Sequence, residues 1–203
     1  MQDEGRKVFR RNAEKPKNVG LIRLRESKTW QIKKMGIDKT RNLYMNITIT
    51  LNGKKISEEI DADKLLIDFV REHGCYSVKR GCETSNCGLC TVFLDEKPVL
   101  SCSVLAARAD GRTVTTLEGL QDEAREFGAF IADQGAEQCG FCNPGFIMNA
   151  LALFREKEYP EEEEIKEYLA GNLCRCSGYE GQLRGIQAFL EWKKEKSGKE
   201  AEA

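Results

Sequence analysis

Two sets of four cysteines constrain this chain more than any other feature of its sequence. The first set has the spacing Cys-x4-Cys-x2-Cys, then eleven residues and a fourth cysteine; its members are Cys82, Cys87, Cys90 and Cys102. The second set is Cys-x2-Cys, then 31 residues and Cys-x-Cys; its members are Cys139, Cys142, Cys174 and Cys176. Four thiolates complete the coordination of two irons bridged by two sulfides, and the first spacing is that of a plant-type [2Fe–2S] loop. The sequence therefore predicts two clusters and indicates an electron relay.

The second set, taken alone, leaves two other interpretations open. Cys-x2-Cys with Cys-x-Cys also suits a zinc site, although the first set favours iron. A thioredoxin-like dithiol at Cys139 and Cys142 is disfavoured, because no strand leads into the motif. A Rieske centre is excluded because it needs two histidines, and His73 is the only histidine in the chain. Cys75, the ninth cysteine, has no partner and is interpreted as an ordinary semi-buried residue.

Composition points to a soluble globular protein in a reducing compartment. The chain is 40% hydrophobic and 32% charged, and no apolar run approaches the ~18 residues that a membrane span needs. The polar, basic N-terminus does not read as a secretory signal. Cysteines with ligand-like spacing and no signal indicate metal ligation rather than disulfides. We therefore expect a cytoplasmic protein with no membrane association.

The charges divide unevenly along the chain. Residues 1–44 contain 13 Lys/Arg and five Asp/Glu, a net charge of +8, and the remainder carries −9. A basic stretch of this kind can bind nucleic acid or an acidic partner surface. We interpret it instead as a flexible basic extension and expect no nucleic-acid partner. Trp30 lies within it.

Residues 45–117 have the pattern of a small α+β domain. Alternating Ile47, Ile49 and Leu51 predict a half-buried strand, and Asn52-Gly53 predicts a type I′ turn into a second strand over residues 54–60. A short helix from about residue 63, a hairpin over residues 91–94 and 97–101, and a strand over residues 113–116 complete the prediction. The first cysteine loop lies between the helix and the hairpin, where its backbone N–H groups are expected to point at the sulfurs.

Residues 118–197 have a helical pattern, followed by a polar tail over residues 198–203. Four helices are predicted at about residues 121–134, 144–157, 161–170 and 179–196. Each cysteine pair of the second set precedes a helix, whose positive end favours a thiolate. We expect a four-helix bundle of two antiparallel hairpins, with the two cysteine pairs meeting at one end.

Two segments resemble a known family. They are residues 81–92, GCETSNCGLCTV, and the pair QCGFCNPG (138–145) with GNLCRCSGY (171–179). Together they resemble the small iron–sulfur subunit of the xanthine dehydrogenase family of molybdenum hydroxylases, over roughly residues 45–196. The loop residues 83–86 are less glycine-rich and less acidic than the family usually has. Leu89, Asn143 and Ser177 also depart from the common residues, but no ligand is lost.

The resemblance implies a fold, partners and site residues. It implies a β-grasp ferredoxin-like domain followed by an all-α four-helix-bundle domain. The second cysteine set would hold the cluster nearest the molybdenum cofactor, and the first set the cluster nearer a flavin or external acceptor. Gln138 and Cys176 would lie against the pterin. A large molybdopterin-binding subunit and an FAD-binding subunit are the implied partners, and no residue of this chain is expected to be catalytic.

These features favour the electron-transfer subunit of a heteromeric molybdenum hydroxylase. The expected substrate is a purine or another N-heteroaromatic compound, and an aldehyde-oxidising enzyme is the alternative within the family. A redox-sensing regulator that binds nucleic acid, and a free-standing ferredoxin-like carrier, are the rivals outside it. The carrier would leave the apolar residues Phe141, Phe146 and Ile147 beside an exposed cluster, which argues against it.

Overall fold

The computed structural model describes residues 43–201 of the 203-residue chain. The predicted basic extension, with Trp30, lies outside the described residues except for Leu43 and Tyr44. Tyr44 is already part of the first strand, so that strand begins one residue earlier than predicted. No helix within the described range is long and apolar enough to cross a membrane.

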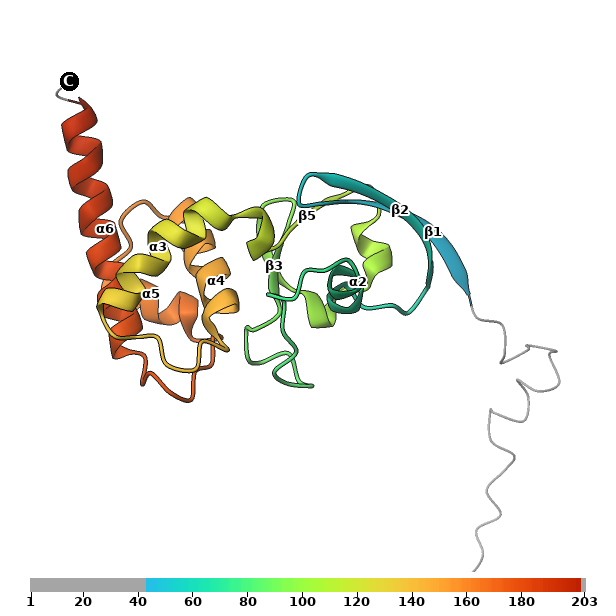
Figure 1. The fold of residues 1–203 in the computed structure, drawn as a ribbon, viewed down its shortest axis with the longest axis horizontal. Helices are drawn as coiled ribbons and strands as arrows, with labels where there is room; N and C mark the ends of the chain where they lie inside the picture. The colour runs from blue at the N-terminus through green and yellow to red at the C-terminus, as the bar shows by residue number, and fades with distance from the viewer. Residues whose placement is uncertain (1–42, 202–203) are drawn as a thin grey trace, which may run out of the picture. The chain divides into compact units, whose positions relative to one another are not determined.

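A five-stranded mixed sheet forms the first half, with the strand order β2-β1-β5-β3-β4 (Figure 1). The strands are β1 (Tyr44–Leu51), β2 (Lys54–Asp61), β3 (Thr91–Leu94), β4 (Lys97–Leu100) and β5 (Thr113–Thr115). β5 lies between the two hairpins, because it pairs parallel with β1 and antiparallel with β3. Helix α2 (Leu66–Glu72) and two short 3-10 helices, η1 (Ser101–Ser103) and η2 (Ala106–Ala109), lie between strands, and a third, η3 (Leu117–Gly119), follows β5. The predicted α+β fold is confirmed.

The turn residues account for the two hairpins. Asn52 and Gly53 have φ values of 48° and 79°, the left-handed pair that a type I′ turn requires. Asp95 and Glu96 form the second turn with φ values of 47° and 65°. The strain there is offset locally, because the Asp95 carboxylate accepts hydrogen bonds from the Thr113 N–H (2.9 Å) and Arg112 Nε (2.7 Å).

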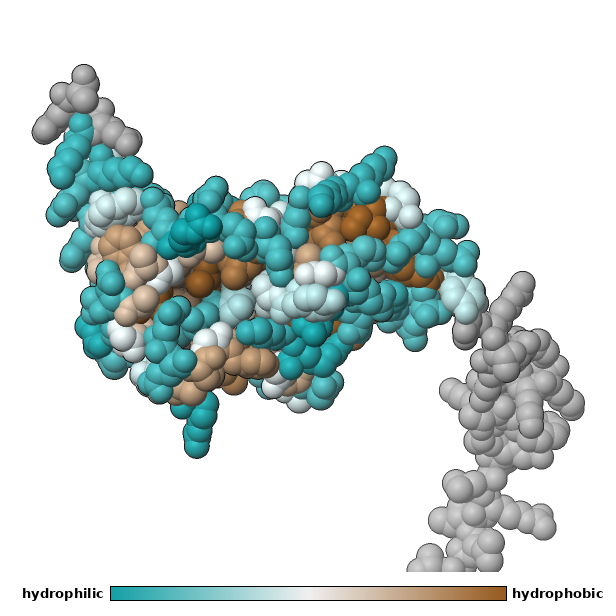
Figure 2. Space-filling view, in the orientation of Figure 1, coloured by the Kyte–Doolittle hydropathy of each residue, from teal (hydrophilic) through white to brown (hydrophobic). Residues whose placement is uncertain are grey.

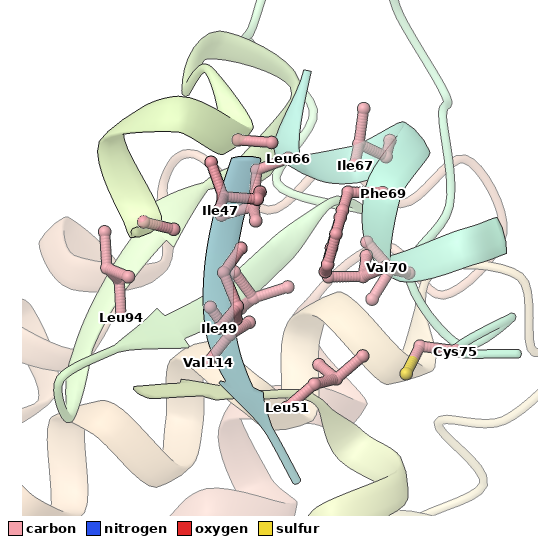
Figure 3. Close-up of a cluster of buried hydrophobic side chains, with 14 of the residues drawn as sticks. Ile47, Ile49, Leu51, Leu66, Ile67, Phe69, Val70, Cys75, Leu94 and Val114 are labelled. Carbon is pink, nitrogen blue, oxygen red and sulfur yellow. The ribbon is translucent and has the colours of Figure 1, made fainter. Parts of the chain in front are cut away.

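Helix α2 packs its apolar side against the sheet. Figure 3 shows side chains of β1, including Ile47 and Ile49, facing those of α2, including Leu66 and Phe69. These four side chains are at most 2% exposed. The helix ends at Glu72, and the C-cap residue His73 contacts the Phe69 carbonyl through Nδ1 (2.8 Å).

Four helices form the second half: α3 (Gln121–Asp133), α4 (Asn143–Glu156), α5 (Glu162–Leu169) and α6 (Glu180–Ala201). Their core contains a cluster of aromatic rings, in which Phe127 lies edge-on to both Phe154 and Phe189 at centroid distances of 5.2 Å. Partly buried Trp192 stacks on Phe189 at 5.6 Å and packs against this core. The bundle is confirmed, and α6 extends past residue 196, where the prediction ended it.

The acidic start of α5 is a capping structure. Glu161 and Glu164 form a reciprocal capping box, in which each side chain accepts from the other residue's backbone N–H. Negative side chains in this first turn also complement the helix dipole. The run of glutamates therefore stabilises the start of α5.

The sheet and the helices share one boundary. Phe93 of β3 is fully buried in the core of the helical half. Arg155 of α4 lies over the Phe93 ring, 4.7 Å from its centroid, and pairs with Glu96 of the β3–β4 turn at 2.6 Å. The two halves are thus packed together rather than only linked by the chain.

Glu118 of η3 ties the segment before the first cysteine loop to the end of the sheet. Its carboxylate accepts hydrogen bonds from the Ser77 N–H (2.8 Å), the Ser77 hydroxyl (2.6 Å) and the Thr116 hydroxyl (2.5 Å). Burial alone would raise the pKa of Glu118, but these donors hold the pKa below its usual 4.5. The folded state therefore favours the ionised carboxylate.

We expect Glu118→Gln to lower the free energy of unfolding by about 2 kcal/mol at pH 7, because the charged acceptor of three hydrogen bonds is lost. The folded pKa lies below the unfolded one, so this stabilisation is present above pH 4.5 and disappears as the pH falls through the folded pKa. Urea unfolding at pH 7 and pH 3.5 measures both values. Glu167→Gln, at an exposed position on α5, is the matched control and should have no effect. A deficit of equal size at both pH values would contradict the prediction.

Candidate functional site

The first cysteine set lies on the loop between α2 and β3, completed by η1. Cys82, Cys87 and Cys90 are on the loop, and Cys102 arrives from η1 after the β3–β4 hairpin. The thiols form two contacting pairs, Cys82 with Cys87 and Cys90 with Cys102. The structure therefore brings together the four residues that the spacing predicted.

Backbone geometry aims hydrogen-bond donors at the sulfurs of this loop. Ser85 and Gly88 adopt positive φ values of 56° and 73°, which curl the chain around the site. The Asn86 N–H lies 3.4 Å from the Cys82 sulfur, and the Ser85 hydroxyl lies 3.4 Å from the Cys102 sulfur. The backbone N–H groups of Thr84 and Asn86 lower the pKa of Cys82 to about 6. This is the arrangement expected of a loop that stabilises thiolate ligands.

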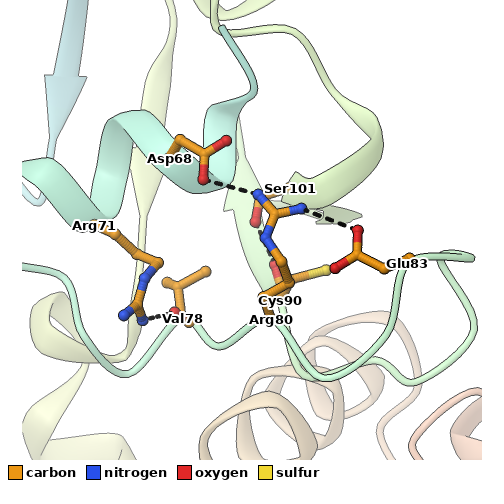
Figure 4. A network of polar contacts seen from close by, with 7 residues as sticks. All are labelled: Asp68, Arg71, Val78, Arg80, Glu83, Cys90 and Ser101. Carbon is orange, nitrogen blue, oxygen red and sulfur yellow. Dashed lines mark hydrogen bonds and ion pairs between the residues drawn. The ribbon is translucent and has the colours of Figure 1, made fainter.

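Polar contacts fix both sides of the loop to the sheet domain (Figure 4). Arg80 pairs with Asp68 of α2 at 2.8 Å and with Glu83 at 3.9 Å. On the other side, the Ser101 hydroxyl donates to the Cys90 carbonyl at 2.7 Å. Burial raises the pKa of Cys90 to about 11. Because a thiol must lose its proton to ligate a metal, metal binding at Cys90 would release that proton.

The second cysteine set joins two loops of the bundle. Cys139 and Cys142 lie between α3 and α4, and Cys174 and Cys176 lie between α5 and α6. The sulfurs of Cys139 and Cys176 are 3.7 Å apart, and Cys142 contacts Cys174. The two cysteine pairs therefore meet, and each contact joins one loop to the other.

Ser177 stabilises a thiolate in this set, a role the sequence did not indicate. Its N–H and hydroxyl lie 3.3 and 3.2 Å from the Cys174 sulfur. Burial would raise the pKa of Cys174, but the Ser177 hydroxyl and the N–H groups of Ser177 and Cys176 lower it to about 7. The Tyr179 hydroxyl accepts from the Cys174 N–H at 3.1 Å and supports the same turn. A serine directly after Cys-x-Cys was the available signal.

Position at the start of a helix does not by itself determine the pKa of every thiol in the second set. Cys142 stands at the start of α4, where the helix dipole favours a thiolate. Burial nevertheless raises the pKa of Cys142 to about 11. Desolvation and the neighbouring Cys174 therefore oppose, at Cys142, the effect expected of a helix start.

In each set, the four thiols thus form two contacting pairs. Within residues 43–201, no three His, Cys, Asp or Glu side chains converge as ligands of a single metal ion. A zinc site needs about four ligands around one ion, whereas a [2Fe–2S] cluster takes two thiolates on each of two irons. The pairing of the thiols within each set matches the ligand arrangement of a two-iron cluster.

One cavity of about 470 Å³ separates the two sets. Cys82 and Cys87 line it from the first set, and all four cysteines line it from the second. Beside this cavity the two cysteine loops are in direct contact, because the Leu173 N–H donates to the Cys87 carbonyl at 3.0 Å. Leu173 immediately precedes Cys174, so this hydrogen bond links a residue of one set to the neighbour of the other.

The second set lies nearer the surface than the first. Cys139 and Cys176 are exposed, whereas Cys87 and Cys90 are buried. Exposed Gln138 donates from Nε2 to the Cys176 carbonyl at 3.0 Å, which brings together the two residues predicted to contact a pterin. Figure 2 shows that the face in view is largely hydrophilic, with apolar side chains in a few patches.

Large apolar side chains surround the exposed sulfurs. Phe141, Leu173 and Tyr179 are 50%, 49% and 47% exposed and line the shared cavity. The sequence grouped Phe141 with Phe146 and Ile147, which are only 3% and 8% exposed. That grouping was wrong for the last two, because they lie on the buried side of α4.

Cys75 is separate from both sets. It is 4% exposed in the core of the sheet domain, where Asn52 Nδ2 lies 3.5 Å from its sulfur. Burial raises the pKa of this thiol. It is a small core residue, more deeply buried than the sequence suggested.

Two family models match the chain. The 2Fe-2S iron-sulfur cluster binding domain matches residues 49–116, and the [2Fe-2S] binding domain matches residues 116–187. Their junction coincides with the segment that follows β5.

Several characterised proteins are similar over most of their length. The nicotinate dehydrogenase small FeS subunit of Eubacterium barkeri is 41% identical over 66% of this chain and 88% of its own. The xanthine dehydrogenase iron-sulfur-binding subunit of Escherichia coli is 41% identical over 67% of this chain and 88% of its own. A chain of quinoline 2-oxidoreductase from Pseudomonas putida 86 superposes with a TM-score of 0.67 at 36% identity, over 73% of this chain and 94% of that one.

Proposed function

This chain belongs to the small [2Fe–2S] subunits of the molybdenum hydroxylase family and serves in electron transfer, and we propose how its residues carry out that role. Cys82, Cys87, Cys90 and Cys102 hold one cluster. Cys139, Cys142, Cys174 and Cys176 hold the other. The contacts of the thiols as two pairs in each set support this assignment. Each bound cluster would accept and release one electron at a time.

Electrons enter at the second set and leave through the first. The observation that carries this direction is the exposure of Cys139 and Cys176 beside Gln138, with the first set's Cys87 and Cys90 buried behind them. The half-exposed Phe141, Leu173 and Tyr179 give this surface the apolar character of a protein interface. The partner there is a large subunit that binds molybdopterin, and Gln138 and Cys176 contact the pterin.

The chain's own residues set the conditions for transfer. The Leu173 N–H and the Cys87 carbonyl hold the two loops in fixed contact. Hydrogen bonds from Ser177 to the Cys174 sulfur, and from Asn86 to the Cys82 sulfur, stabilise negative charge at each site. Burial of Cys87 and Cys90 excludes water from the inner side. These groups supply no general acid, base or nucleophile, so substrate chemistry takes place on the partner.

The substrate is an N-heteroaromatic compound, with a purine as the first candidate. The names of the similar proteins refer to nicotinate, xanthine and quinoline, and all three compounds are N-heteroaromatic rings. A second partner that binds FAD takes the electrons onward from the first set. The complex works in the cytoplasm, where a reducing milieu keeps eight thiols available as ligands.

A native pull-down of the full chain tests the proposal. We expect a larger subunit to co-purify with molybdenum and pterin, and about four irons per copy of this chain. The captured complex should reduce an artificial acceptor with xanthine, nicotinate or quinoline, and more slowly with an aldehyde. Zinc in place of iron, or a complex without pterin, would refute the proposal. Preference for the aldehyde would move the enzyme to the other branch of the family.

A further inference from the structure

Lys79 connects the two cysteine loops. It lies three residues before Cys82 in the segment that leads into the first set. Its backbone N–H donates to the carbonyl of Leu89 at 3.2 Å, and Leu89 immediately precedes Cys90. The main chain of Lys79 is therefore fixed to the first loop.

The side chain of Lys79 reaches the second loop. Its Nζ donates to the carbonyl of Phe141 at 3.1 Å and lies 4.7 Å from the centroid of the Phe141 ring. Phe141 stands between Cys139 and Cys142 and lines the cavity that all four cysteines of the second set share. The ammonium group thus contacts the peptide that joins Phe141 to the second-set ligand Cys142.

No carboxylate neutralises this cation. Among residues 43–201, the ion pairs include the neighbouring Arg80, which is bound to Asp68 and Glu83, but none includes Lys79. Its ammonium is bound only by a carbonyl oxygen and a ring face. An uncompensated charge in a half-buried site is less screened than one on an open surface.

We propose that Lys79 is a positioning residue that raises the reduction potential of the second cluster relative to the first. A tetrathiolate [2Fe–2S] cluster is anionic and gains one more negative charge when it accepts an electron. A fixed cation at its loop stabilises the reduced form more than the oxidised form. Lys79 therefore favours electron uptake at the entry site, and its contact with Phe141 holds that loop against the first one.

The inference rests on the ligand assignment proposed above, and the test separates the two. The full chain is reconstituted with iron and sulfide, and both clusters are titrated with dithionite under EPR detection. Lys79→Met removes the charge but keeps an unbranched side chain. Lys79→Arg keeps the charge. Lys55→Met changes an exposed lysine on β2 and is the matched control.

We expect Lys79→Met to retain both EPR signals and to shift the midpoint of the second cluster to a more negative value. The equilibrium share of electrons on that cluster should fall on the order of tenfold. Lys79→Arg should shift it much less, and Lys55→Met not at all. If Lys79→Met loses iron, Lys79→Gln takes its place, because its amide can still donate to the Phe141 carbonyl without a charge.

The outcomes are distinct. Full iron content and two signals with unmoved midpoints in Lys79→Met or Lys79→Gln would overturn the role of Lys79. An equal shift of both midpoints would also overturn it, because the charge would then not act preferentially on the second loop. Failure of the ligand assignment would appear differently, as the wrong number of signals in the unsubstituted chain.

Discussion

Cys87→Ala removes one of two reduced [2Fe–2S] EPR signals and about half of the bound iron, whereas Cys142→Ala removes the other signal and the other half. This result is expected because the thiols of each set contact only members of their own set, while the backbone link from Cys87 to Leu173 uses a carbonyl rather than a sulfur. Losing one of four thiolates leaves an iron without its second protein ligand. EPR of anaerobically reduced protein, together with iron and sulfide analysis, measures both losses.

Cys75→Ala is the control for these variants. Its thiol is buried in the sheet core, outside both sets, so the variant should keep both signals and all of the iron. A modest loss of stability is expected from the small cavity. Loss of both signals in Cys87→Ala would show that the cysteines are partitioned wrongly.

Gly145→Ala should separate the two cysteine loops, with a loss of about 1–3 kcal/mol in unfolding free energy from overpacking. A Cβ at Gly145, in the first turn of α4, would lie 2.4 Å from the Gly88 carbonyl oxygen and 2.8 Å from the Leu89 Cα. Both obstructing atoms are backbone, so no side chain can move aside to make room. Thermal unfolding measures the stability, and rapid reduction followed by freeze-quench EPR measures electron transfer between the clusters. We expect slower transfer with both clusters present.

Gly128→Ala is the matched control, because Gly128 is also a helical glycine but has nothing within 4 Å of an added Cβ. That change should stabilise the protein by about 0.5–1 kcal/mol through helix propensity. Equal effects of the two substitutions would contradict the close approach of α4 to the first loop.

The sequence predicted the secondary structure well where periodicity and turn chemistry agree. Asn52-Gly53 and the alternation of Ile47, Ile49 and Leu51 predicted the first hairpin, and α3 and α4 each lie within one residue of the predicted bounds. Helix α5 differs in one respect, because Gly171 after its end does not adopt a positive φ as a C-cap glycine usually does. The Gly171 carbonyl instead lies against Gly88 of the first loop, a tertiary contact that no local pattern could indicate.

The sequence predicted which cysteines group together. It did not predict the surroundings of each cysteine. Spacing separates Cys82 from Cys139 because the two motifs lie far apart in the chain. It cannot reveal that desolvation raises the pKa of Cys142 to about 11 or that Ser177 donates to Cys174. Nor can it distinguish exposed Phe141 from buried Phe146, because that difference depends on which side of α4 meets the other helices.

The hydrogen bond from Leu173 to the Cys87 carbonyl limits how this protein can be recombined. A graft that joined the helical half to an unrelated plant-type ferredoxin would bring four cysteines of similar spacing. It would also have to orient the backbone carbonyl at the position of Cys87 toward the Leu173 N–H. In addition it would need a glycine at position 88, where a Cβ would lie 2.6 Å from the Gly171 oxygen. The two halves are therefore complementary where Cys87 and Gly88 meet Gly171 and Leu173. A substitution on one side of this contact requires a compensating substitution on the other.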